Sequence, residues 1–318
     1  MDFTIRPATT ADYPTIVAIG WSATPDFGLS VADLAFADSV CTPATIARRV
    51  VAVTDDDHIV GAAYYSQSAP KDDPQRFCIW LHVLPQFQGC GIGKGLYALM
   101  LAELAAHKPR CLETGVRTDL PRAMRFLAER GFVEARRECE TQLDLTSFTP
   151  TAFAEDLQRV ARRGITLQTL SELAADPARN AKLYELHRRQ HEAEGPQTTF
   201  AAFAEWQASF WRLPHLLPDG FCVAVDGENY IGHSHARRSE TAILSYGYTG
   251  ILPAYRNQGI ARAMKLRVLE WAKAQGYTAV RSWSDSRNEA MIRVNLHLGF
   301  VVQPPVLWVE QKWKPPRF

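Results

Sequence analysis

Two stretches of the chain decide its fold: Val83-Leu-Pro-Gln-Phe-Gln-Gly-Cys-Gly-Ile-Gly93 and Ile251-Leu-Pro-Ala-Tyr-Arg-Asn-Gln-Gly-Ile-Ala261. Their offset is 251 − 83 = 168 residues, and the same offset carries Gly131 to Gly299 downstream. No insertion or deletion therefore separates the two motifs in either half. Such a duplication indicates two successive copies of one domain, which suits 318 residues at about 100 to 200 residues per domain.

Each half shows the same order of expected elements: strand, helices, hairpin, strand, Gly-rich loop, helix, strand, helix and strand. The hairpins are marked by polar turns between apolar runs, Asp55-Asp-Asp57 in the first half and Asp226-Gly-Glu-Asn229 in the second. Leu96, Met100 and Leu104 recur at helical spacing after the first loop. The fold class is therefore α/β (α+β), with sheets flanked by helices.

The domain boundaries follow from the repeat and from one helical segment between the halves. Residues 149–163 contain Pro150 to Arg163, which favour a connecting helix closed by Gly164. We expect domains at 1–148 and 164–318.

Composition excludes several classes of protein. With 35 basic and 34 acidic residues the formal charge is +1, so no overall positive field attracts nucleic acid. The apolar runs are much shorter than the roughly 20 residues of a membrane span, and the first residues do not read as a basic-then-apolar leader. We expect a cytoplasmic monomer or homodimer without nucleic-acid or membrane partners.

Cysteine and histidine spacing gives no sign of a metal. The six cysteines stand singly, without a C-x-x-C pair, and are expected to be reduced thiols. His187 and His191 would share one helix face, but the neighbouring Arg188, Arg189 and Glu192 favour a solvated face over a metal site. No metal cofactor is expected.

The Gly-rich loops have the character of phosphate-binding loops. A strand that leads through small residues into a helix points free backbone N–H groups and the positive helix end at one spot. A nucleotide P-loop does not fit, because three residues rather than four separate Gly89 from Gly93-Lys94, and Gly95 follows where Ser or Thr would hold magnesium.

A dinucleotide-binding G-x-G-x-x-G is a closer alternative, with Glu113 as its ribose-binding acid. Its third glycine would be Lys94, however, and the second half has Asn257 and Arg281 in place of the first glycine and the acid. The pattern common to both halves is Gln/Arg-x-x-Gly-x-Gly/Ala.

This shared pattern, together with the preceding Val-x-Pro or Ile-x-Pro and the closing Leu298-Gly-Phe300, resembles the GNAT superfamily of N-acetyltransferases in a tandem two-domain form. The resemblance covers essentially the whole chain. It implies a splayed mixed sheet in each half, with acetyl-CoA where the fourth and fifth strands part. Backbone groups at Val83 and Ile251 would pair with the pantetheine. The pyrophosphate would be held by Gln88, Gly89, Cys90, Gly91, Ile92, Gly93 and Lys94, and by Arg256, Asn257, Gln258, Gly259, Ile260, Ala261 and Arg262.

The resemblance also favours the second half as the catalytic one. Asn288 matches a coenzyme-contacting Asn of the family, and Asn295 stands where many relatives carry a Tyr near the thiol. The offset of 168 places Leu120 and Leu127 at these positions in the first half. Neither leucine can donate a hydrogen bond.

The general base is left open between several groups. Neither expected fourth strand contains a carboxylate, so the candidates in the second half are Tyr248, Tyr246, His233 and His235. In the first half His82 is the comparable group, either in the core or in the cleft.

The expected reaction is direct transfer of acetyl from acetyl-CoA to the amine of a small-molecule acceptor. An acyl-enzyme on Cys90 is disfavoured because Gln258 occupies the same position in the second half. The alternative is a coenzyme A-binding regulatory or structural protein without turnover, since the usual Tyr and Glu are missing.

Overall fold

The computed structural model describes residues 2–24, 29–41, 45–69, 73–195, 199–238 and 241–314. The chain divides into two compact units. Unit 1 comprises Met1–Arg137 and Val306–Phe318, and unit 2 comprises Glu138–Pro305. The boundaries expected at 148 and 164 differ from this division, because the last strand of each repeat lies in the other unit's sheet.

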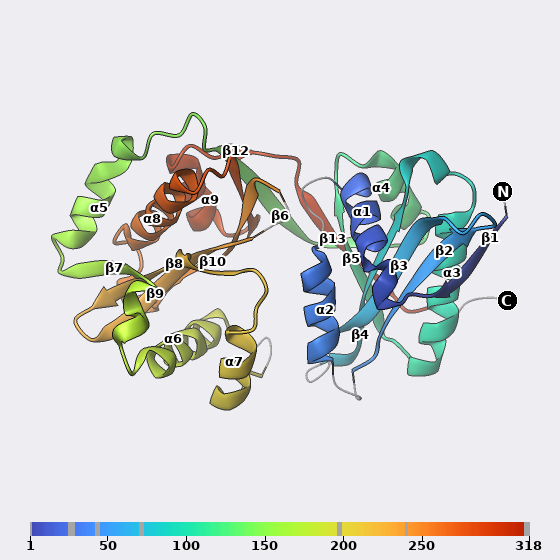
Figure 1. The fold of residues 1–318 in the computed structure, drawn as a ribbon, viewed down its shortest axis with the longest axis horizontal. Helices are drawn as coiled ribbons and strands as arrows, with labels where there is room; N and C mark the ends of the chain where they lie inside the picture. Colours follow the sequence, from blue (N-terminus) through green and yellow to red (C-terminus); the bar gives the residue numbers. More distant parts are fainter. Residues whose placement is uncertain are drawn as a thin grey trace. The chain divides into compact units, whose positions relative to one another are not determined.

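Unit 1 is built on one mixed sheet (Figure 1). Its strands in spatial order are β1 (Phe3–Pro7), β2 (Ala47–Thr54), β3 (Ile59–Ala69), β4 (Asp73–Val83), β5 (Cys111–Arg117) and β13 (Val306–Lys312). Only β4 and β5 run parallel; the other neighbours are antiparallel.

Helices cover both faces of this sheet. They are α1 (Tyr13–Ala23), α2 (Val31–Val40), α3 (Ile92–Leu104) and α4 (Pro121–Ala128). Successive residues of β2 point to opposite faces: Val50 packs in the core beneath α3, while Val51 packs toward Ile16 of α1. Leu96 and Leu104 of α3 are fully buried, as their spacing predicts.

Unit 2 repeats this plan. Its strands in order are β7 (Ile165–Thr169), β8 (Leu216–Asp226), β9 (Asn229–Arg237), β10 (Ile243–Ile251), β11 (Ala279–Asp285) and the part of β6 (Val133–Asp144) that begins at Glu138, with β12 (Val301–Val302) also paired to β6. Its helices are α5 (Ala154–Ala161), α6 (Arg179–Glu194), α7 (Phe203–Phe210), α8 (Ile260–Ala274) and α9 (Glu289–His297). Short 3-10 turns occur at Thr10–Asp12, Pro85–Phe87, Ala105–His107, Pro150–Phe153, Glu172–Ala175 and Pro253–Tyr255.

The two repeats have exchanged their last strands. In unit 1, β13 pairs with β5, with Val306 opposite Arg117; in unit 2, β6 pairs with β11, with Glu138 opposite Asp285. These four residues are related in pairs by the 168-residue offset, so the register is the same and only the partners differ. Figure 1 shows the orange-red β13 beside β5, among strands from the start of the chain.

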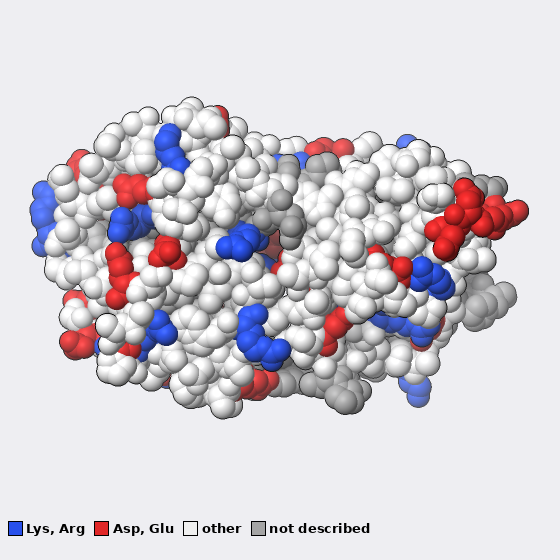
Figure 2. All heavy atoms as spheres, in the orientation of Figure 1, with Lys and Arg blue, Asp and Glu red and all other residues white. Residues whose placement is uncertain are grey.

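The surface carries both signs of charge, as the near-zero net charge predicts, and the cysteines form no disulfides. Basic and acidic side chains are interspersed over most of the face in Figure 2. All six cysteines are free. Within the described ranges, no helix combines the length and apolar character that crossing a membrane requires.

Candidate active site

The parallel strands of each unit part toward their carboxyl ends. Pairing of β4 with β5 ends at Cys78 and Glu113, and pairing of β10 with β11 ends at Ser245 and Arg281. Since β4 remains paired with β3 up to Val83, only the edge of β4 that faces β5 is open. This splay leaves backbone groups in a cleft where a ligand can pair with them.

The Gly-rich loops follow the splayed strands with the same geometry in both units. Gly91 precedes α3 with φ 87° and Gly259 precedes α8 with φ 81°, a left-handed conformation that favours glycine. Each helix therefore presents the unbonded N–H groups of its first turn to the loop.

The residues that begin the shared motif close these loops. The Gln88 side-chain amide donates to the carbonyl of Val83 at 3.1 Å, and the Arg256 guanidinium donates to the carbonyl of Ile251 at 3.3 Å. In this structure both side chains thus contact the end of their own strand. This contact explains why Gln88 and Arg256 occupy the same position in the two repeats, and it could not be inferred from the sequence.

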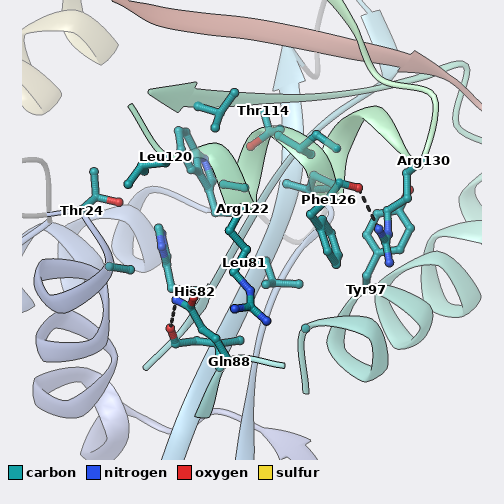
Figure 3. A pocket seen from close by; sticks show the side chains of 18 of the residues that line it. Thr24, Leu81, His82, Gln88, Tyr97, Thr114, Leu120, Arg122, Phe126 and Arg130 are labelled. Carbon is teal, nitrogen blue, oxygen red and sulfur yellow. Dashed lines mark hydrogen bonds between the residues drawn. The ribbon is translucent and has the colours of Figure 1, made fainter. Parts of the chain in front are cut away.

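A cavity of about 500 Å³ opens beside the loop of unit 1 (Figure 3). It reaches both faces of the sheet through the splay. Leu81 and Gly93 line it on the α3 face, whereas His82 and Thr24 line it on the α1 face. Figure 3 shows Arg122 extending from α4 across the cavity toward Gln88.

Two cations at this cavity are uncommitted. Lys94 and Arg122 have no ion pair or hydrogen bond with another residue in the part of unit 1 that the structure describes. By contrast, Arg117 pairs with Asp119, and Arg130 lies 3.4 Å from the Phe126 ring centroid. Together with the N-terminus of α3, the uncommitted pair forms a site suited to a phosphate-bearing anion.

The corresponding loop of unit 2 is covered by α5. Arg262, at the position of Lys94, forms an ion pair of 3.1 Å with the buried Asp156 of that helix. The other carboxylate oxygen lies 2.9 Å from Nε2 of His297. Arg163 donates to the side chain of Gln258 at 2.8 Å. The linker thus supplies an anion to the cationic side chain of this loop.

The two asparagines favoured by the sequence form internal bonds in unit 2. Asn288 caps α9, its side chain accepting the N–H of Met291 at 3.1 Å. Asn295 is fully buried and donates to the hydroxyls of Thr141 at 3.0 Å and Ser282 at 3.2 Å. Both side chains have a structural function in this arrangement.

Among the remaining candidates of the second half, His233, His235 and Tyr248 gather in a ring cluster. His233 stacks on Tyr248 with ring centroids 5.0 Å apart, and both His233 and His235 stack on Phe221. The Tyr248 hydroxyl donates to Glu194 at 2.6 Å. Burial and that carboxylate raise the pKa of Tyr248.

His187 belongs to this cluster, contrary to the solvated face expected for it. Its ring centroid lies 4.6 Å from that of His233, and its Nδ1 accepts the indole N–H of Trp206. Burial lowers the pKa of His187 to about 4 and that of His235 to about 3, and it lowers the pKa of His233 well below the usual value. All three imidazoles are therefore neutral at pH 7.

These buried imidazoles predict an acid-sensitive unit 2. In the unfolded chain they titrate near pH 6.5, so below that pH the unfolded state binds more protons than the folded state. The free energy of unfolding should fall from pH 7 to pH 5 by about 2 kcal/mol per fully buried imidazole. Urea unfolding should show a smaller fall in His233→Phe, while the exposed-histidine control His58→Gln should match the parent chain. An equal pH dependence in all three proteins would contradict this assignment.

No group of three or more His, Cys, Asp or Glu among the described residues is arranged to hold a metal ion.

The sequence profile of the Acetyltransferase (GNAT) family matches residues 19–132 and 180–300, which is one match for each repeat. The chain belongs to this family. Its fold confirms the tandem form expected from the sequence, with a splayed mixed sheet in each unit.

Similar proteins and solved structures match this chain along most of its length. The mycothiol acetyltransferase of Thermobispora bispora is 26% identical over 258 residues, covering 79% of this chain and 80% of the relative. That of Rhodococcus jostii is 27% identical over 255 residues, covering 78% and 77%. A tandem GNAT protein from the clavulanic acid biosynthesis pathway superposes with a TM-score of 0.74 at 18% identity, covering 99% of this chain and all of that one. A GCN5-related N-acetyltransferase from Sphaerobacter thermophilus gives 0.68 at 18% identity, covering 98% and 95%.

Proposed function

We propose that this GNAT protein transfers acetyl directly from acetyl-CoA, bound in unit 1, to the amine of a small-molecule acceptor. The observation that carries the proposal is the cavity of about 500 Å³ that joins the Gly-rich loop to the opposite face of the sheet. The coenzyme and the acceptor can approach each other through it from the two faces. The name of the curated relatives supports acetyl as the transferred group.

The choice of unit 1 departs from the sequence-based preference for the second half. Lys94 and Arg122 are uncommitted at the first loop, whereas Arg262 at the second loop is already neutralised by Asp156. To bind there, a pyrophosphate would have to displace the buried Asp156 carboxylate from its two partners, Arg262 and His297. A buried carboxylate without a partner costs more free energy than one exposed contact with the pyrophosphate would provide.

Each part of the coenzyme has a suitable partner in unit 1. The first-turn N–H groups of α3, with Lys94 and Arg122, suit the pyrophosphate. The open edge of β4 between Ile79 and Val83 suits the pantetheine amides, because its backbone groups have no strand opposite them. Cys90 is exposed on the loop and is not among the residues that line the cavity, which favours direct transfer over an acyl-enzyme.

Calorimetric titration with acetyl-CoA tests the assignment of the loop. We expect one binding site per chain and a loss of affinity of about tenfold in both Lys94→Gln and Arg122→Gln, since each removes one charge-assisted contact worth about 1.5 kcal/mol. Arg256→Gln is the matched control: it removes a cation from the loop of unit 2 and introduces the residue that unit 1 carries there. Its affinity should equal that of the parent chain.

Two equal sites, or a loss confined to Arg256→Gln, would contradict binding in unit 1. Release of the coenzyme A thiol in the presence of a panel of primary amines then separates the enzyme from a coenzyme-binding regulatory protein. The regulatory alternative predicts full affinity and no amine-dependent release.

A further inference from the structure

His82 occupies a distinctive place in the cavity of unit 1. It lies on β4 directly before Val83, and its cross-strand neighbour is Ala62, which packs on the α1 face of the sheet. The side chain is half-buried and lines the cavity. In the described part of the chain it forms no hydrogen bond with another residue, so its ring nitrogens are available to a ligand.

The coenzyme and the acceptor would lie on opposite faces of the sheet, on either side of the gap between β4 and β5. The loop, Lys94 and Arg122 place the coenzyme on the α3 side, where Leu81 and Val83 also point. An acceptor that attacks the acetyl carbon must then arrive from the α1 side. On that side the described lining includes Ala23, Thr24 and His82. His82 is the group among these that can accept a proton.

We propose that His82 is the general base for the acceptor amine, an inference that rests on coenzyme binding in unit 1. The amine nitrogen attacks the thioester carbonyl carbon, a C–N bond forms, and the C–S bond breaks as the tetrahedral intermediate collapses. The imidazole takes the proton that the nitrogen loses. Coenzyme A leaves as the thiolate, which is protonated from solvent, and His82 returns its proton to solvent.

The protonation state of His82 suits this role. Burial lowers the pKa of its imidazole to about 4, so the ring is neutral and carries a free lone pair throughout the neutral range. An imidazole of that pKa is too weak to strip an ammonium ion, so the acceptor must enter as the free amine. It is strong enough to take the proton from the N-protonated amide that remains once the C–S bond has broken, because that N–H is far more acidic than an ammonium.

Bromoacetyl-CoA tests the position of His82 without any knowledge of the acceptor. This analogue carries an electrophilic carbon next to the thioester carbonyl, and a neutral imidazole displaces its bromide with loss of a proton to solvent. In a Cys90→Ala background, which removes the exposed thiol of the loop, we expect one adduct per chain, mapped to His82 by mass spectrometry. Excess acetyl-CoA should prevent it.

The matched variant is His82→Gln in the same background. It should bind acetyl-CoA with unchanged affinity, melt at a similar temperature, and lose the adduct. A label on another residue, or no label despite intact acetyl-CoA binding, would overturn the role of His82 and leave the proposed function standing. Failure of the parent chain to bind acetyl-CoA would overturn the proposed function itself, together with this inference.

Discussion

Replacement of Gly91 by glutamate is expected to lower acetyl-CoA affinity by at least a hundredfold, whereas the equivalent change Gly259→Glu should leave affinity within about twofold. A Cβ added at Gly91 meets no neighbouring atom within 4 Å, so the new carboxylate would stand in the open loop, at the proposed pyrophosphate site. At Gly259 the added Cβ lies 3.6 Å from the guanidinium of Arg262, in a loop that α5 already covers. A hundredfold change corresponds to about 2.7 kcal/mol, a reasonable value for two like charges in a shielded loop.

The two glycines form a matched pair because both have a positive φ, 87° and 81°, so any backbone strain from the new side chain is shared. Thermal melting confirms that each variant folds before affinity and kcat/KM are measured. The sequence-based preference for the second half predicts the opposite order. Loss of binding in Gly259→Glu alone would place the working coenzyme site in unit 2.

A chain that ends at Pro305 is expected to lose the fold of unit 1 and all acetyl-CoA binding. The deletion removes β13, which pairs with β5 at seven positions from Val306 to Lys312. Leu307 and Val309 are buried in the core of unit 1, and each buried side chain of this size stabilises the fold by about 1.5 to 3 kcal/mol. The backbone hydrogen bonds between β5 and β13 are lost as well. The total loss of unfolding free energy is then comparable to the whole stability of an ordinary domain, about 5 to 15 kcal/mol.

Side chains of β13 hold other parts of unit 1 as well. Gln311 accepts a hydrogen bond from the hydroxyl of Tyr97 and donates to the carbonyl of Arg130, and the ring of Trp308 packs edge-on against Trp80. A chain that ends at Lys314 keeps β13 and is the control. Near-ultraviolet circular dichroism and acetyl-CoA titration should match the full chain in the control only. Normal coenzyme binding by the 1–305 chain would disprove the dependence of unit 1 on β13.

The repeat, the loops and the helices after them could be predicted because each leaves a local pattern. Apolar spacing predicts α3, and small residues after an apolar strand predict a phosphate-binding loop. The exchange of β6 and β13 could not be predicted. Glu138 and Val306 are related by the repeat offset, so either strand satisfies the alternation and register of either sheet.

A comparison of equivalent positions favours the second half, because Asn288 and Asn295 replace Leu120 and Leu127. It does not include Asp156, because α5 lies between the repeats and has no counterpart in the first half. Asp156 precedes the second loop by about a hundred residues and becomes its partner only in the folded unit.

Alternation along a strand does not by itself show which face of the sheet borders a cavity. His82 and His233 both alternate with apolar residues on strands, a pattern that fits a core position or a cleft position. The structure places His82 at the cavity and His233 in a closed ring cluster. The signal that separates them is the splay of β4 from β5, which begins at Ile79 and opens the strand next to His82.

The exchange of β13 also sets the order in which the protein can be completed during synthesis. Chains emerge from the ribosome with the N-terminus first, and most domains fold in that order. Here unit 2 has all its strands once Val302 has emerged, but unit 1 waits for Lys312. The half that is made first is therefore finished last, because the cavity of unit 1, which Val306 helps to line, is complete only after β13 has been translated.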